Sequence, residues 1–121
     1  MPGVQTLVPI MLTHVVDGRL SLERFVDLTS HGPGRIFGTA GKGRLAEGYD
    51  ADLTIVDLKA RRTITAAATA SRCGWTPFDG FEAKAWPIAT IIRGRVVMRD
   101  DEVIAEGTGA PVRFLETLVG C

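Results

Sequence analysis

This sequence of 121 residues holds little of what several classes of protein require. It has two cysteines, two histidines and one tyrosine, and its 14 basic residues balance its 14 acidic residues. Two cysteines as far apart as Cys73 and Cys121 do not make the disulfide framework of a small secreted domain. A chain without net charge carries no field that attracts nucleic acid or an anionic membrane. We therefore predict free thiols, a cytoplasmic protein and no nucleic-acid partner.

Long apolar runs and targeting signals are also missing. No apolar run comes near the ~20 residues of a membrane-spanning helix. The first residues lack the basic stretch and the small-residue cleavage site of a signal peptide, so no membrane partner is expected. Because 45% of the residues are hydrophobic and 23% are charged, the composition is that of a globular domain. The length excludes a complete (β/α)₈ barrel, which needs about 250 residues.

The first third of the chain has the apolar spacing of helices. Residues 5–17 carry apolar side chains at helical intervals, which predicts one helix. A second helix is predicted over residues 21–30, with Ser21 as its N-cap. A break is expected at residues 31–32, followed by a short helical turn over residues 33–37 that begins with a proline.

From residue 41 the sequence favours strands. Arg93-Gly94 and Asp100-Asp101 predict tight turns between neighbouring strands. A stretch without clear pattern, residues 66–87, is expected to be a long irregular loop. Helices followed by strands, without alternation, predict an α+β fold. The predicted strands are residues 53–57, 62–65, 88–92, 95–98 and 103–105.

The histidines do not predict a metal site. His14 and His31 lie on different predicted helices, and the sequence contains neither an HxH nor an HExxH pair. A hydrolytic zinc site needs three or four converging ligands. We expect packing or capping roles for both histidines.

Other candidate catalytic residues are equally isolated. Asp50 and Asp52 lie two apart, as paired catalytic carboxylates on a strand can, but a turn role is favoured for Asp50. Lys42 lies between two glycines and departs from the phosphate-loop pattern. Cys73 has only Arg72 beside it to favour a thiolate, which disfavours a nucleophile. These residues do not assemble an active site.

Residues 42–57, KGRLAEGYDADLTIVD, resemble the KGxIxxGxDADLxIxD signature of the amidohydrolase superfamily. In that family the signature leads from a metal-dependent barrel into a small accessory β-sandwich. Residues 71–80 and 89–97 are similar to the tail of the cyclic amidohydrolases, with dihydroorotase ahead of allantoinase and hydantoinase. Residues 2–9 and 30–38 are similar to the segments after the last barrel strand and the last barrel helix. The resemblance covers nearly the whole chain.

The resemblance implies a chain in two parts. Residues 1–40 would be the C-terminal helices of the metal-dependent (β/α)₈ barrel, and residues 41–121 would be part of the accessory β-sandwich, with its loop and C-terminal tail. The family hydrolyses a cyclic amide, such as dihydroorotate to carbamoyl-aspartate in pyrimidine biosynthesis, and uses zinc. The family's zinc ligands and catalytic aspartate would all precede Met1, so none is assigned here. Only Pro2 and Gly3 are expected to border the substrate.

Several hypotheses follow from this resemblance. The first is a C-terminal fragment of a dihydroorotase-type zinc amidohydrolase, inert alone, with Met1 an internal methionine and the missing N-terminal part as its partner. The second is a non-catalytic, dihydroorotase-like interaction or scaffold module. A small independent enzyme using Cys73 or His31 is the third. An incomplete sandwich would expose strand edges within residues 51–105, which predicts a homo-oligomer. The cyclic amide of the parent enzyme stays open.

Overall fold

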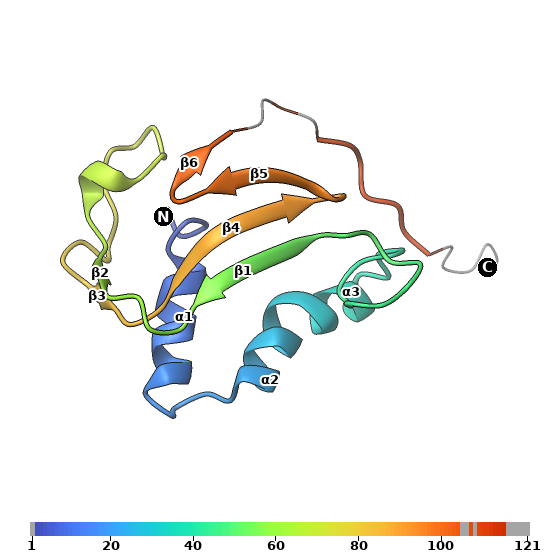
Figure 1. The fold of residues 1–121 in the computed structure, drawn as a ribbon, viewed down its shortest axis with the longest axis horizontal. Coiled ribbons are helices and arrows are strands. Elements are labelled where there is room, and N and C mark those ends of the chain that lie inside the picture. Colours follow the sequence, from blue (N-terminus) through green and yellow to red (C-terminus); the bar gives the residue numbers. More distant parts are fainter. Residues whose placement is uncertain (1, 105–106, 108, 116–121) are drawn as a thin grey trace, which may run out of the picture.

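The computed structural model describes residues 2–104, 107 and 109–115, so Met1 and Cys121 lie outside the described residues. The chain is α+β, as predicted, with its helices before its strands (Figure 1). The helical elements are α1 (Leu7–Val16), α2 (Leu22–Val26), a π-helical turn (Asp27–His31), α3 (Gly32–Ile36) and a 3₁₀ turn (Ala66–Ala68). The strands are β1 (Leu53–Asp57), β2 (Arg62–Thr63), β3 (Glu82–Ala83), β4 (Trp86–Ile92), β5 (Arg95–Arg99) and β6 (Glu102–Val103).

Four strands form an antiparallel sheet in the order β1-β4-β5-β6, and β2 and β3 form a separate two-stranded ribbon. The helices α1, α2 and α3 lie on one side of the sheet, and the ribbon lies beside α1 (Figure 1). The strands β1 and β6 are the outer strands of the sheet. Both predicted turns are confirmed, since Arg93, Gly94, Asp100 and Asp101 all have positive φ, as two-residue hairpin turns require.

The core lies between α1, α2 and the start of β4. Leu12, Phe25 and Ala85 are its buried centre. This confirms the predicted apolar stripe of the first helix. The core is small for a chain of which 45% of the residues are hydrophobic. Large apolar side chains such as those of Ile36 and Leu45 remain 73% and 87% exposed. No helix in the described parts of the chain is long and apolar enough to cross a membrane.

The predicted break at residues 31–32 is wrong. Ser21 does cap α2, since its Oγ accepts a hydrogen bond from the Arg24 N–H at 3.1 Å. The helical path then continues, because His31 and Gly32 both have helical backbone angles. A Cβ on Gly32 would lie 2.5 Å from the carbonyl oxygen of Asp27. The glycine therefore permits the wide π turn, where the sequence pattern had favoured a helix end.

The observed irregular loop is shorter than the predicted range of residues 66–87. That range contains a 3₁₀ turn, all of β3 and the start of β4. The β2 strand spans two residues of the predicted four, and Ile64 instead turns into the protein, 4% exposed, with its N–H bonded to the Phe81 carbonyl at 2.9 Å. Pro87 is tolerated in β4 because it lies beside a bulge in the pairing with β1. The last predicted strand, 103–105, overlaps the observed β6 only at Val103, because β6 spans Glu102–Val103 and Ile104 follows it. Residue 105 lies outside the described residues.

Candidate functional site

The segment that resembles the family signature contains a cluster of three charged side chains, Lys42, Asp50 and Asp52. The Nζ of Lys42 forms ion pairs with Asp50, at 2.8 Å, and with Asp52. The other oxygen of Asp52 accepts a hydrogen bond from the Arg93 N–H at 2.8 Å. The cluster therefore holds the loop before β1 against the turn between β4 and β5.

The cluster fixes the charge state of its members. Hydrogen bonds to Asp50 and Asp52 raise the pKa of Lys42. Partial burial by itself acts to raise the pKa of Asp52, but the hydrogen bonds from Lys42 and from the Arg93 N–H outweigh it and leave that pKa lowered. The two carboxylates share a cation, so they are not the isolated like-charged pair that acid–base catalysis uses. The cluster is structural.

Gly43, next to this lysine, lies against the helical part of the chain. Its φ is +81°, and a Cβ there would lie 2.8 Å from the carbonyl oxygen of Ser30 in the π-helical turn. Glycine is the residue that allows both the left-handed backbone and the close contact. Gly43 thus serves packing, which agrees with the departure of residues 41–43 from the phosphate-loop pattern.

A groove of about 550 Å³ lies between the N-terminal segment, the loop after the 3₁₀ turn and the sheet. Pro2 and Gly3, the residues expected to border the substrate, line it. That role stays a prediction. The other lining residues are Val4, Gln5, Thr6, Val8, Thr54, Thr69, Ala70, Ser71, Trp86, Pro87, Thr90, Met98, Asp101 and Val103.

A cluster that the sequence pattern does not reveal borders this groove, which Trp86 and Asp101 both line. Asp101 accepts a hydrogen bond from the Trp86 indole N–H at 2.7 Å, and its other oxygen forms an ion pair with Arg62. The guanidinium of Arg62 also lies 5.3 Å from the centre of the Trp86 ring. The cluster joins β2 to the main sheet. The only signal in the sequence was the predicted Asp100-Asp101 turn, which does not reveal its partners.

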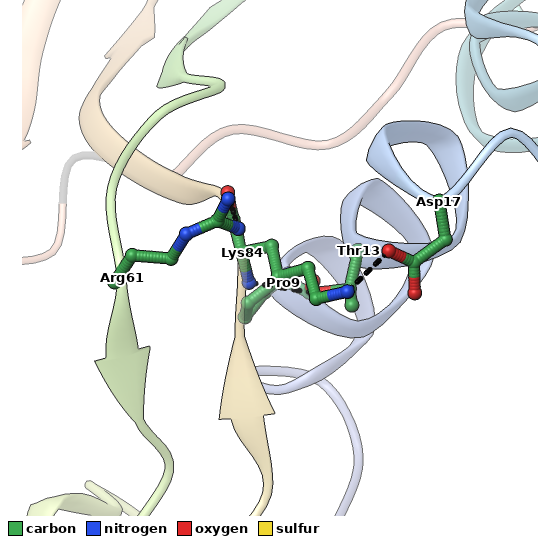
Figure 2. Close-up of polar contacts among 5 residues, drawn as sticks. All are labelled: Pro9, Thr13, Asp17, Arg61 and Lys84. Carbon is green, nitrogen blue, oxygen red and sulfur yellow. Dashed lines mark hydrogen bonds and ion pairs between the residues drawn. The ribbon is translucent and has the colours of Figure 1, made fainter.

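A second contact that the sequence did not reveal joins α1 to the segment after β3 (Figure 2). The Thr13 hydroxyl donates to the Pro9 carbonyl at 2.7 Å and accepts from the Lys84 N–H at 3.0 Å. The Lys84 ammonium forms an ion pair with Asp17, and its hydrogen bond lowers the pKa of that carboxyl. The Lys84 carbonyl accepts from Arg61 at 3.4 Å. Thr13 is 4% exposed, so its hydroxyl replaces water as the partner of a backbone N–H.

The histidines and the cysteine stay apart from one another. His14 is half-buried in α1, and the Nδ1 of His31 accepts a hydrogen bond from Arg44 at 3.4 Å. Cys73 is an exposed free thiol, 3.0 Å from the hydroxyl of Ser71, and that hydrogen bond lowers the pKa of the thiol. Among the residues that the structure describes, no three His, Cys, Asp or Glu side chains are grouped to hold a metal ion. The described residues therefore do not provide the ligands for the zinc that the resemblance implies.

The sequence of this chain matches a family of known proteins. The sequence pattern of the Amidohydrolase family matches residues 4–97, which are most of the chain. The chain therefore belongs to the amidohydrolase family. The dihydroorotase of Methanothermobacter thermautotrophicus is 44% identical over 109 residues, which are 90% of this chain and 25% of that protein. The dihydroorotase of Pyrococcus furiosus is 43% identical over 90% of this chain and 26% of that protein.

Solved structures of related enzymes share this fold. The L-hydantoinase from Arthrobacter aurescens has a TM-score of 0.83 and 42% identity, over 86% of this chain and 24% of that one. A D-hydantoinase from Thermus sp. has a TM-score of 0.78 and 33% identity, over 88% and 24%. The chain thus spans about a quarter of the relatives it matches. Its resemblance to the C-terminal part of a dihydroorotase is confirmed.

Proposed function

We propose that this chain is the C-terminal segment of a dihydroorotase-type zinc amidohydrolase and supplies structure to that enzyme without supplying its metal ligands. In this proposal residues 1–40 end the barrel, residues 41–121 form part of the accessory β-sandwich, and Pro2 and Gly3 border the substrate. The observation that carries it is the 44% identity to a dihydroorotase, sustained over 90% of this chain but only 25% of that protein. Alone, the chain does not hydrolyse cyclic amides.

The charge cluster supports the structural part of this proposal. Lys42 pairs with both Asp50 and Asp52, Asp52 binds the turn between β4 and β5, and Gly43 lies against the π-helical turn. The residues of the predicted signature thus hold their own loop against the sheet and against the helical part. Such contacts are needed whatever the enzyme's substrate is. The signature therefore supports the family more strongly than the substrate.

A hydantoinase is the second candidate for the parent enzyme. The observation that favours it is the TM-score of 0.83 and the 42% identity to the L-hydantoinase from Arthrobacter aurescens. Dihydroorotase ranks first because the dihydroorotases of two different genera match 90% of this chain at 43–44% identity. The two enzymes are distinguished by their substrates, which can be tested side by side.

Complementation tests the proposal. The chain is produced together with the Methanothermobacter thermautotrophicus dihydroorotase from which the matching quarter has been removed. With zinc added, we expect neither part to hydrolyse dihydroorotate alone and both together to do so. Restored activity in an Arthrobacter aurescens L-hydantoinase truncated in the same way, without restored activity in the dihydroorotase, would favour the second candidate. A stable complex without turnover of either substrate would instead support the scaffold module, and turnover by this chain alone would overturn the proposal.

We also propose that the uncombined chain self-associates in a reducing, cytoplasmic compartment. The outer strands β1 and β6 and exposed apolar side chains such as Ile36 and Leu45 support this. Free strand edges and apolar patches favour association. Sedimentation at micromolar concentration should show dimers or larger species. A stable monomer would contradict this proposal, and addition of the truncated dihydroorotase should reduce the self-association.

A further inference from the structure

The side chain of Gln5 joins two segments that are more than sixty residues apart in the sequence. Its Nε2 donates to the Ala68 carbonyl at 3.0 Å, and its Oε1 accepts from the Ala70 N–H at 2.9 Å. A carboxamide offers one donor group and one acceptor group, so it satisfies both backbone groups at once. A carboxylate of the same shape offers acceptors only. The loop after the 3₁₀ turn is therefore held by the one side-chain type, Asn or Gln, that fits both bonds.

This contact lies between two cavities. The groove of about 550 Å³ that Pro2 and Gly3 line is bordered by Gln5 and Ala70. A second cavity of about 350 Å³, on the side of β2, is lined by Gln5 and Ala70 as well, but not by Pro2 or Gly3. The Gln5-bound loop is thus a wall that the two cavities share. Its position sets the width of the groove on the side away from the sheet.

Gly3 is held from the other direction by α1. Its carbonyl accepts from the Leu7 N–H at 3.0 Å and from the Thr6 hydroxyl at 3.3 Å. Gln5 belongs to the same short turn before α1 as Gly3. It therefore connects the loop at Ala68 and Ala70 to the turn in which the Gly3 carbonyl is bound. A change in the loop contact is therefore transmitted over two residues to Gly3.

We propose that Gln5 is a positioning residue, which holds the Ala68–Ala70 backbone against the turn before α1 and so fixes Pro2 and Gly3 and the loop side of the groove. The inference rests on the proposed function, in which Pro2 and Gly3 border the cyclic amide. Gln5 shapes a wall of the binding site and does not contact the reacting atoms. Its loss therefore raises KM and leaves kcat nearly unchanged.

The test uses the complemented enzyme with Gln5→Glu and Gln5→Ala. Gln5→Glu keeps the shape but replaces the donor to Ala68 by a second acceptor. We expect KM for dihydroorotate, or for a hydantoin if that is the substrate, to rise about three- to tenfold, with kcat within about twofold. Lys84→Met is the matched control, because it removes an ion pair at the other end of α1, outside the groove. It should leave KM unchanged.

Amide hydrogen exchange in the chain alone tests the contact separately. Gln5→Ala should speed exchange at the Ala70 N–H, whereas Gln5→Glu should preserve its protection, since the acceptor remains. Unchanged exchange in Gln5→Ala would overturn the inference whatever the activity. An active wild-type complex with unchanged KM in both variants would overturn the positioning role alone. An inactive wild-type complex with normal exchange behaviour would overturn the proposed function and the positioning role, while the contact itself would stand.

Discussion

Two contacts hold separate parts of this chain in place, one between segments far apart in the sequence and one within residues 42–52, and they use different chemistry. Thr13 meets Lys84 through a neutral, buried hydroxyl. Lys42 meets Asp50 and Asp52 through ion pairs whose side chains are 23%, 32% and 34% exposed. A buried hydrogen bond is costly to leave unmade, whereas water and salt screen a partly exposed ion pair. The family signature marks the second contact, but the first should stabilise the fold more per bond.

The largest effect should come from the glycine beside the ionic contact. Gly43→Ala places a Cβ 2.8 Å from the Ser30 carbonyl and forces alanine into a left-handed backbone. We expect the free energy of unfolding to fall by about 3 kcal/mol in urea denaturation. Gly48→Ala is the matched control, because Gly48 has the same left-handed φ, +83°, with nothing within 4 Å of its Cβ position. It should lose only about 1 kcal/mol, from the backbone alone.

Equal losses in the two glycine variants would show that the contact with the π-helical turn is unimportant. In that case the backbone angle alone would explain the glycine of the signature. A larger loss at Gly43 would instead show that close packing against the π-helical turn stabilises this region in addition to the ion pairs. The comparison therefore separates packing from backbone strain at the glycine beside Lys42.

The buried hydroxyl comes next. Thr13→Val keeps the shape but leaves the Lys84 N–H without its acceptor, so the free energy of unfolding should fall by about 1–2 kcal/mol. Thr13→Ser keeps the hydroxyl and should recover most of that loss. Because the bond is neutral, the difference between the two variants should be constant between pH 5 and pH 8 in urea titrations. A strong pH dependence would mean that the neighbouring Lys84–Asp17 ion pair carries the effect.

The two contacts also show what could be predicted from the sequence. The helices followed from apolar spacing and Ser21, the two tight turns from Arg93-Gly94 and Asp100-Asp101, and the family from residues 42–57. All of these are local patterns. Thr13 and its partner Lys84 are 71 residues apart, and a threonine in an apolar helix has no local mark that distinguishes it. The break at residues 31–32 was predicted wrongly because local glycine preference was outweighed by the close backbone approach in the π turn.

The candidate site was predictable only in part for the same reason. Residues 42–57 identified the family, but their pattern could not show that Lys42 sits between the two carboxylates. Gln5 and the cluster around Asp101 depend on loops that meet only in the folded chain. Pro2 and Gly3 were placed by resemblance alone. The contacts of Gln5 and Asp101 join residues far apart in the sequence, so residue type alone does not predict them.

Removing the cation of the ionic contact should have a smaller effect than removing the buried hydroxyl. Lys42→Met leaves Asp50 and Asp52 facing each other, and we expect a loss of about 1 kcal/mol at pH 7 and low salt, after allowance for screening by water. The loss should shrink at high salt. A loss above that of Thr13→Val would reverse the ranking of the two contacts.

The ionic contact should also depend on pH. The folded state lowers the pKa of Asp52 from its ordinary value of 3.8. Its contribution is therefore complete well above pH 3.8, at about pH 5 and higher, and is lost as the pH falls through the lower folded value. The stability difference between wild type and Asp52→Asn should shrink between pH 5 and pH 2. The amide oxygen introduced by Asp52→Asn can still accept from the Arg93 N–H, so equal stability of the two proteins at every pH would show that this backbone bond, rather than charge, carries the contact.

The smallest effect should come from an ion pair that joins nothing distant. Arg24 and Asp27 lie three residues apart on one helical path, 2.7 Å from each other, with side chains 59% and 33% exposed. Arg24→Ala should change the free energy of unfolding by less than about 0.5 kcal/mol, because alanine is also the better helix former. The backbone N–H of Arg24 still donates to Ser21, so the cap survives this change, whereas Ser21→Ala should cost about 1 kcal/mol. If Arg24→Ala were as destabilising as Lys42→Met, charge pairing itself would explain the ionic contact. If it is not, the Lys42 contact is stabilising because it holds Asp52, which joins the loop before β1 to the turn between β4 and β5.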